Sequence, residues 1–349
     1  MSWGHATSAD LYNWQEQPVA IACTPTSGIF SGSAVVDINN TSGFGTTDNP
    51  PIVAIYTEHQ NDESNQSQCL AYSIDEGLTF TKYEGNPVLD INLPNFRDPK
   101  VSWIDGQWIM TLALPQEFKI SFYSSPNLKE WTHLSDFGPA AEVGGIWECP
   151  DLFQIGDKWV LIVSLNPGGL YGSGTQYFIG DFDGTTFVPR YSTEKPRWLD
   201  FGKNNYAGVT FSNEPNGKRI LIGWLANWTD VKNHPETSWT TQMTIPRELG
   251  LMNYKKEIVL TQKPLCDTLY ELKVKTPESG VIGLKGFAKI GYNADKKVVF
   301  VNEFEASYIP TTDDLHLKVV VDRCSIELFT GDGVRSISLA IFPEPGTSR

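Results

Sequence analysis

The stretch IWECPD, residues 146–151, places a glutamate between a tryptophan and a cysteine–proline pair. A carboxyl group enclosed by apolar neighbours has a raised pKa, and such a group can act as a general acid. Glu148 is therefore a candidate proton donor. A buried glutamate with a purely structural role would have the same sequence surroundings, so the motif alone does not decide between the two.

A second acidic candidate is Asp98 in FRDPK, residues 96–100. Arg97 precedes it, and Pro99 restricts the backbone that follows. Arg97 and Asp98 can form a structural ion pair. Alternatively, Asp98 is a carboxylate of low pKa that stays ionised and binds sugar hydroxyl groups. Both interpretations are open on these residues alone.

Other common catalytic chemistries find no support. The chain has no GxSxG, no HExxH and no glycine-rich phosphate loop, and its five histidines lack the spacing of metal ligands. Five cysteines without a CxxC pair indicate neither a zinc site nor a small disulfide scaffold. We therefore expect no metal and no organic cofactor.

Composition narrows the class of ligand. The net charge of −14 argues against nucleic acid as a partner, because phosphates would be repelled. No stretch approaches the ~18–20 apolar residues of a membrane span. The 11 Trp, 18 Phe and 13 Tyr favour a protein that stacks rings on its ligand, and carbohydrate is the usual ligand of that kind for an acidic protein.

The elements that must position the two carboxylates are strands. Short runs rich in β-branched and aromatic residues, such as PIVAIYTE (51–58) and KWVLIVSL (158–165), alternate with Gly, Asn, Asp and Pro clusters. Asp105-Gly106 between two apolar runs predicts a two-residue hairpin. The pattern is typical of an all-β protein.

A weak internal repeat predicts a β-propeller. Turns that contain Asp or Asn precede the aromatic residues Trp14, Phe80, Trp131 and Phe187, at intervals of about 50 to 65 residues. Near residue 264 apolar and polar residues begin to alternate more regularly, and lysines become more frequent. This change predicts a propeller over 1–264 and a small β-sandwich over 265–349. Because the innermost strands of a propeller converge on its axis, both carboxylates should face one pocket.

Several motifs in order resemble one family. They are WGHATS (3–8), FSGS (30–33), NNTSG (39–43), FRDPKV (96–101), WECPDLF (147–153), GWLANW (223–228) and VVDRCSIELFTGDG (319–332). Together they resemble the β-fructofuranosidases, which are invertases, exo-inulinases and levanases. The resemblance implies a five-bladed β-propeller followed by a β-sandwich. It also implies cleavage of terminal β-D-fructofuranosyl residues of sucrose or fructans with retention of configuration.

The resemblance also implies roles for individual residues. Glu148 would be the acid/base and Asp98 the transition-state stabiliser, with Arg97 orienting it. Cys149 would modulate the acid/base, and a cysteine there favours sucrose over polymeric fructan. The residues that align with the family's substrate pocket are Trp3, Phe30, Ser31 and Trp228.

Three departures from the family pattern qualify these expectations. The family nucleophile is an aspartate in a motif that precedes WGHATS, whereas this chain enters WGHATS directly after Met1-Ser2, and Asp10 has the wrong context. An incomplete first blade and a chain that does not turn over alone are therefore expected. The sandwich should be shortened, and an aspartate that relatives carry near Asn204 is missing.

The family is extracellular, but no signal peptide is recognisable.

Two rival functions follow from the same residues. A non-catalytic fructan- or sugar-binding protein would keep the pocket without the chemistry. A sialidase is suggested by SIDEGLTF (73–80), but sialidases need an arginine triad, and only Arg97 stands in a plausible pocket segment. In each case the partner is a sugar; the oligomeric state is not indicated.

Overall fold

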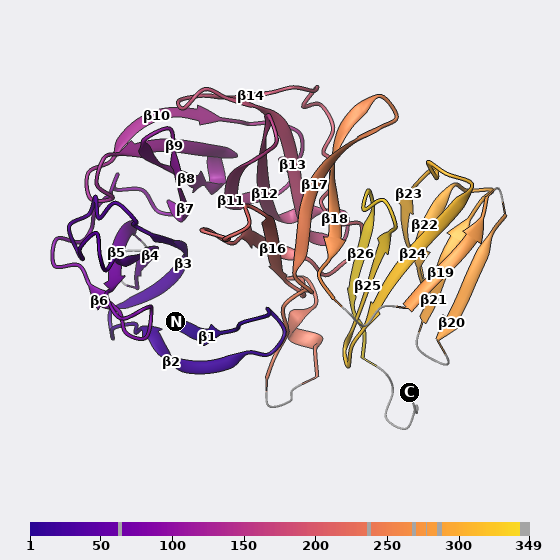
Figure 1. The fold of residues 1–349 in the computed structure, drawn as a ribbon, viewed down its shortest axis with the longest axis horizontal. Coiled ribbons are helices and arrows are strands. Elements are labelled where there is room, and N and C mark those ends of the chain that lie inside the picture. The colour runs from indigo at the N-terminus through magenta and orange to yellow at the C-terminus, as the bar shows by residue number, and fades with distance from the viewer. Residues whose placement is uncertain (62–64, 236–238, 267–269, 277, 285–287, 343–349) are drawn as a thin grey trace. The chain divides into compact units, whose positions relative to one another are not determined.

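The computed structural model describes residues 1–61, 65–235, 239–266, 270–276, 278–284 and 288–342. Nearly all regular structure in these ranges is β-strand (Figure 1). Two 3-10 turns, Pro115–Glu117 and Val231–Asn233, are the helical elements of the described residues. No helix in this part of the chain is long and apolar enough to cross a membrane.

The strands before residue 265 form one two-stranded sheet and four four-stranded antiparallel sheets. Where the sequence predicts an incomplete first blade, the structure has the two-stranded sheet; the number of blades stays a prediction. The strands, sheet by sheet, are β1 (Trp3–Thr7) and β2 (Gln15–Ile21); β3 (Ser27–Val36), β4 (Ile52–Gln60), β5 (Gln66–Ser73) and β6 (Thr81–Lys82); β7 (Arg97–Ile104), β8 (Gln107–Leu114), β9 (Lys119–Ser125) and β10 (Thr132–Phe137); β11 (Ile146–Ile155), β12 (Lys158–Gly169), β13 (Gly172–Phe182) and β14 (Phe187–Pro189); β15 (Tyr206–Thr210), β16 (Arg219–Trp224), β17 (Arg247–Tyr254) and β18 (Glu257–Pro264).

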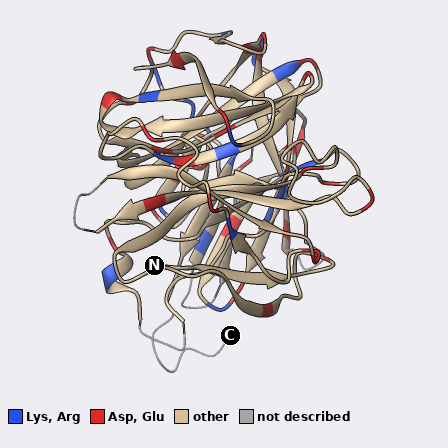
Figure 2. Ribbon diagram, turned by 90° about the vertical axis from the view of Figure 1, so that its left-hand side faces the viewer, with Lys and Arg blue, Asp and Glu red and all other residues tan. Residues whose placement is uncertain are grey.

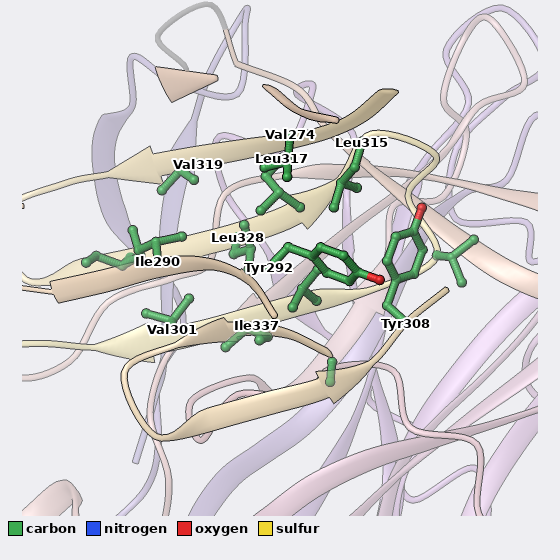
Figure 3. Close-up of a cluster of buried hydrophobic side chains, with 14 of the residues drawn as sticks. Val274, Ile290, Tyr292, Val301, Tyr308, Leu315, Leu317, Val319, Leu328 and Ile337 are labelled. Atoms are coloured by element: carbon green, nitrogen blue, oxygen red, sulfur yellow. The ribbon is translucent and has the colours of Figure 1, made fainter. Parts of the chain in front are cut away.

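The remaining strands form two further four-stranded sheets that enclose an apolar core. Figure 3 shows part of this core, where Leu317 and Val319 of one sheet lie near Ile290 and Val301 of the other. One sheet contains β19 (Tyr270–Lys275), β24 (Asp314–Val321), β25 (Ser325–Thr330) and β26 (Ser336–Ala340), and the other contains β20 (Gly280–Leu284), β21 (Ala288–Asn293), β22 (Val298–Val301) and β23 (Phe304–Ser307).

The hairpin predicted at Asp105-Gly106 is confirmed. It joins β7 to β8, and both turn residues have positive φ, 48° and 86°. Such a turn matches the right-handed twist of the flanking strands, and the short side chain of Asp and the absence of one in Gly make it accessible.

The chain forms two compact units, residues 1–163 with 180–194 and residues 164–179 with 195–349. The first unit contains the sheets of β3 and β7 and the strand β11. In it, β3 lies against β7 and β7 lies against β11, so that the first strands of consecutive sheets are neighbours. Acidic and basic residues are interspersed along the strands and the loops (Figure 2).

A recurrent irregularity marks these first strands. The register against the second strand shifts between Ile29 and Gly32 in β3, and between Arg97 and Lys100 in β7. Gly32 is required at its bulge, because a Cβ there would come within 2.0 Å of the carbonyl oxygen of Ile55. In β11 the break is visible as a positive φ of 48° at Cys149. Bulges of this kind redirect side chains, and they are common next to active sites.

Candidate active site

The bulge in β7 turns two consecutive side chains inward. Asp98 has φ 65°, and the following Pro99 has no N–H to offer the sheet. Regular strand alternation would place Arg97 and Asp98 on opposite faces. With the bulge, Arg97 is 8% exposed and Asp98 is 6% exposed, and both contact residues of β11.

Strand β11 has the same construction. Cys149 has a left-handed backbone, and Pro150 follows it. Trp147 is fully buried, and its indole N–H donates to the carbonyl oxygen of Glu142 at 2.9 Å. Glu148 points to the other side, toward Arg97. The Glu148 carboxyl group thus contacts a guanidinium, whereas the sequence suggests an enclosure by apolar neighbours.

Arg97 holds Glu148 directly. The guanidinium donates to Oε1 from Nη2 at 2.9 Å and from Nε at 3.2 Å. The same guanidinium donates from Nη1 to Asn95 Oδ1 at 2.9 Å and to Gln66 Oε1 at 3.2 Å. A planar guanidinium with several partners cannot rotate freely, so the position of the Glu148 carboxyl group is fixed.

Asp98 is fixed through both its backbone and its side chain. Its N–H donates to Thr57 Oγ1 at 3.0 Å, and the Thr57 hydroxyl donates to Gln68 Oε1 at 2.8 Å. Its Oδ2 accepts the backbone N–H of Cys149 at 2.9 Å, with the Cys149 thiol 3.6 Å away. Asp98 thus joins the β4–β5 pair to β11.

The protonation of this group differs from the sequence-based expectation. Burial raises the pKa of Asp98 to about 6, and the charge of Glu148 adds to the effect, whereas Arg97 and the N–H of Cys149 oppose it. The expectation of a low pKa at Asp98 is wrong, because desolvation outweighs the adjacent guanidinium. Burial, followed by the charge of Asp98, also raises the pKa of the Cys149 thiol, which stays protonated.

The other predicted pocket residues of the first unit lie on β1 and β3. The Trp3 indole donates to the carbonyl oxygen of Phe30 at 2.8 Å, and the Trp3 ring packs edge-on against Tyr56. The Phe30 ring stacks on His59 with 4.7 Å between centroids. Ser31 is exposed. Trp3 therefore anchors β1 to β3, and whether these three residues bind substrate stays a prediction.

Trp228 belongs to the second unit. Its side chain is 54% exposed, and its ring lies 5.0 Å from that of Trp224. The preceding Asn227 is fully buried and holds the turn, since its side-chain amide donates to the carbonyl oxygen of Lys203 at 2.8 Å and its Oδ1 accepts the N–H of Ser173.

Sequence reasoning missed the residues that support the two carboxylates. They are Ser33, Thr57, Gln66, Gln68 and Asn95. The available signal was polar residues inside otherwise apolar strands, such as the threonine of PIVAIYTE and the glutamines of NQSQCLAY. A buried polar side chain has to find a hydrogen-bond partner, so such positions indicate a network. Among the described residues, no group of three or more His, Cys, Asp or Glu could hold a metal ion.

Two family models match consecutive parts of the chain. The glycosyl hydrolases family 32 N-terminal domain matches residues 1–264, and the glycosyl hydrolases family 32 C-terminal model matches residues 266–349. The chain belongs to glycosyl hydrolase family 32. The predicted family, the all-β fold class with propeller and sandwich, and the glycosidase type are confirmed.

Individual family 32 relatives agree with this assignment. The chain is 37% identical to a levanase of Bacillus subtilis over 99% of its own length and 60% of that protein, and 35% identical to an extracellular exo-inulinase of Aspergillus niger over 98% and 82%. It therefore spans less than two thirds of the levanase.

Solved structures of the family superpose on nearly the whole chain. The exo-inulinase of Aspergillus awamori gives a TM-score of 0.87 at 33% identity, covering 98% of this chain and 85% of that one. A β-fructofuranosidase of Schwanniomyces occidentalis in complex with fructosyl-erythritol gives 0.86 at 32% identity, over 99% and 83%. The β-fructofuranosidase type of function is thereby supported.

Proposed function

We propose that this family 32 chain binds terminal β-D-fructofuranosyl residues of sucrose or fructans, and that it does so for their hydrolysis with retention of configuration. The observation that carries the proposal is the convergence of Arg97, Asp98 and Glu148 from two neighbouring strands. Relatives named levanase, exo-inulinase and invertase support the substrate class. The solved β-fructofuranosidase with bound fructosyl-erythritol supports a fructosyl unit as the bound sugar.

Glu148 is the proposed acid/base. A retaining glycosidase needs one carboxyl group that protonates the departing glycosidic oxygen and later removes a proton from water. Arg97 keeps the Glu148 carboxyl group in one orientation through its two hydrogen bonds to Oε1. Positioning of this kind is a large part of what a general acid requires.

Asp98 is the proposed ligand of the fructose hydroxyl groups. Its Oδ2 is held by the backbone N–H of Cys149, which fixes the carboxyl group beside Glu148. As an ionised group in a desolvated site, Asp98 would stabilise the positive charge that develops in an oxocarbenium-like transition state. The adjacent Arg97 favours the ionised form.

The second carboxylate of a retaining pair acts as nucleophile. The family's nucleophile motif is not recognised in the sequence, so we propose that this chain binds a fructosyl unit and shows no turnover when it is assayed by itself. A non-catalytic sugar-binding protein is the alternative, and the same missing motif favours it. Cys149 favours sucrose as substrate, whereas levanase and exo-inulinase relatives favour fructans.

The test combines binding with hydrolysis. Residues 1–349 are assayed for fructose release from sucrose, inulin and levan, and for fructose binding by calorimetry. We expect binding without turnover, and we expect Asp98→Asn to weaken binding at least ~10-fold, as expected when a buried hydrogen-bonded charge is lost. Glu148→Gln should bind fructose as the unsubstituted chain does.

Each outcome bears on a different part of the proposal. Fructose release that falls ~10²–10⁴-fold in Glu148→Gln would confirm the acid/base role and place the nucleophile inside these residues. Release that survives Glu148→Gln would overturn the role of Glu148. A chain that neither binds fructose nor releases it would overturn the proposed function.

Two further proposals concern the location of the protein and its domain boundary. Extracellular relatives support an extracellular location for this chain. The more regular alternation of apolar and polar residues begins near residue 265, where the two family models meet. We propose the boundary between propeller and sandwich there.

A further inference from the structure

Two four-residue segments on neighbouring strands have the same backbone plan and opposite charges. Residues 97–100 of β7 read RDPK, and residues 148–151 of β11 read ECPD. In both, the second residue has a left-handed backbone, with φ 65° at Asp98 and 48° at Cys149, and the third is proline. The first and fourth residues are basic on β7 and acidic on β11.

The two segments therefore meet in two ion pairs rather than one. The first is Arg97–Glu148 at the site, with 2.9 Å between Nη2 and Oε1. In the second, Lys100 Nζ lies 3.9 Å from Asp151 Oδ2. The second pair is the more deeply buried, because its side chains are 7% and 0% exposed, compared with 10% and 17% in the first pair.

The backbones of the two strands also meet at the level of the second pair. The hydroxyl of Thr111 on β8 lies 3.4 Å from the carbonyl oxygen of Lys100 and 3.4 Å from that of Pro150. Thr111 is 2% exposed, so its hydroxyl can donate to either strand but not to bulk water. Lys100 and Asp151 thus stand where β7, β8 and β11 are packed together.

We propose that Lys100 and Asp151 are positioning residues of the active site: their ion pair fixes β7 against β11 and thereby places Asp98 beside Glu148. Neither residue is assigned a contact with substrate. Separating two buried charges is strongly unfavourable, so the pair resists any sliding of one strand along the other. Without it, the strands are held less firmly, and water gains access to Asp98.

The experiment measures the titration of Asp98 itself, by the ¹³C shift of its carboxyl carbon against pH, with Asp98→Asn for assignment. The titratable groups that act on Asp98 are Arg97 on its own strand and, on β11, Glu148 and the neutral thiol of Cys149. The variants are Lys100→Met alone and Lys100→Met together with Asp151→Asn. The control is Lys119→Met with Glu117→Gln, which removes an exposed pair of the same unit.

A simple charge effect and a positioning effect predict different changes in the pKa of Asp98. Loss of the Lys100 charge alone would raise the pKa of Asp98, and loss of both charges would leave it nearly unchanged. Loss of positioning admits water and lowers the pKa, by more than about half a unit, in both variants. We expect the lowered value in both and no change in the control.

The proposal is overturned if the pKa of Asp98 rises in Lys100→Met, or if it stays within ~0.2 of its original value in the double variant. The double variant leaves no buried charge unpaired, so it keeps the test valid if the single variant fails to fold. Fructose affinity, expected to fall at least ~10-fold in the double variant, is the second readout and rests on the proposed function. If the unsubstituted chain has no affinity for fructose, the proposed function is wrong. The titration of Asp98 still tests the positioning role of Lys100 and Asp151.

Discussion

Asp98 combines an unusual backbone with an unusual pKa, and both have thermodynamic consequences. The residue before a proline normally avoids helical and left-handed conformations, yet Asp98 has φ 65°. Cys149, also before a proline, does the same. Strained backbone that recurs at a site is typical of function, because only a rigid surrounding structure maintains it.

The pKa of Asp98 predicts how stability depends on pH. Its pKa rises from 3.8 to about 6 on folding, so between these values the native state holds a proton that the unfolded state has released. Stability from this group is therefore present below pH 4 and is lost as the pH rises through 6. The loss is on the order of 3 kcal/mol.

Asp98→Asn should remove this pH dependence. We expect the free energy of unfolding of the variant, relative to the unsubstituted chain, to increase by up to about 3 kcal/mol between pH 4 and pH 7. Urea unfolding at the two pH values measures it. Parallel pH profiles for the two proteins would show that Asp98 is not the group responsible.

At the scale of the strand, bulges leave backbone groups that the sheet no longer pairs. Ser33 of β3 supplies the missing partners in β7, because its hydroxyl donates to the carbonyl oxygen of Pro99 at 2.9 Å and accepts the N–H of Val101 at 3.1 Å. One side chain on a neighbouring sheet therefore stabilises the bulge that presents Asp98.

Ser33→Ala should destabilise the chain by about 1–3 kcal/mol, the cost of leaving buried backbone groups without partners. Urea unfolding measures the effect. Ser31→Ala is the matched control in the same strand, since Ser31 is exposed and its substitution should change the free energy of unfolding by less than ~0.5 kcal/mol. Equal effects in the two variants would contradict the role of Ser33.

How far the sequence predicts these elements depends on whether the signal is local. The hairpin at Asp105-Gly106 is local turn chemistry, and it could be predicted. The bulge at Asp98 could not, because the preference of a residue before proline points the other way. The roles of Ser33 and Thr57 depend on which strand lies opposite. The charges of Arg97 and Glu148 were visible, but their pairing required the fold.

At the scale of the molecule, the second unit is organised around a buried cation. Arg247 on β17 is fully buried and donates to Asp200 at 3.0 Å and to Glu327 on β25 at 2.6 Å. It also donates to Gln262 on β18 and to Ser338 on β26. Burial raises the pKa of Glu327, with Arg247 opposing the rise. This cluster links the sheet of β15–β18 to a sandwich sheet within that unit.

Arg247→Met should cost about 3–5 kcal/mol, because it leaves two buried carboxyl groups without their cation. Chemical unfolding measures the cost. Lys296→Met is the control, since the Lys296 side chain is 60% exposed in its pair with Glu305 and should contribute less than ~1 kcal/mol. A cost below ~1 kcal/mol for Arg247→Met would mean that the unit does not depend on this cluster.

The left-handed residues of β7 and β11 have a consequence for how motion in this protein can be followed. The amide protons of Asp98 and Cys149 are held by side chains, the Thr57 hydroxyl and the Asp98 carboxylate, rather than by a neighbouring strand. Their exchange with deuterium therefore reports the loosening of β7 from its neighbours around Asp98, separately from the fraying of either sheet. Two backbone positions become internal probes of whether the site is assembled, and they need no attached reporter group, ligand or turnover.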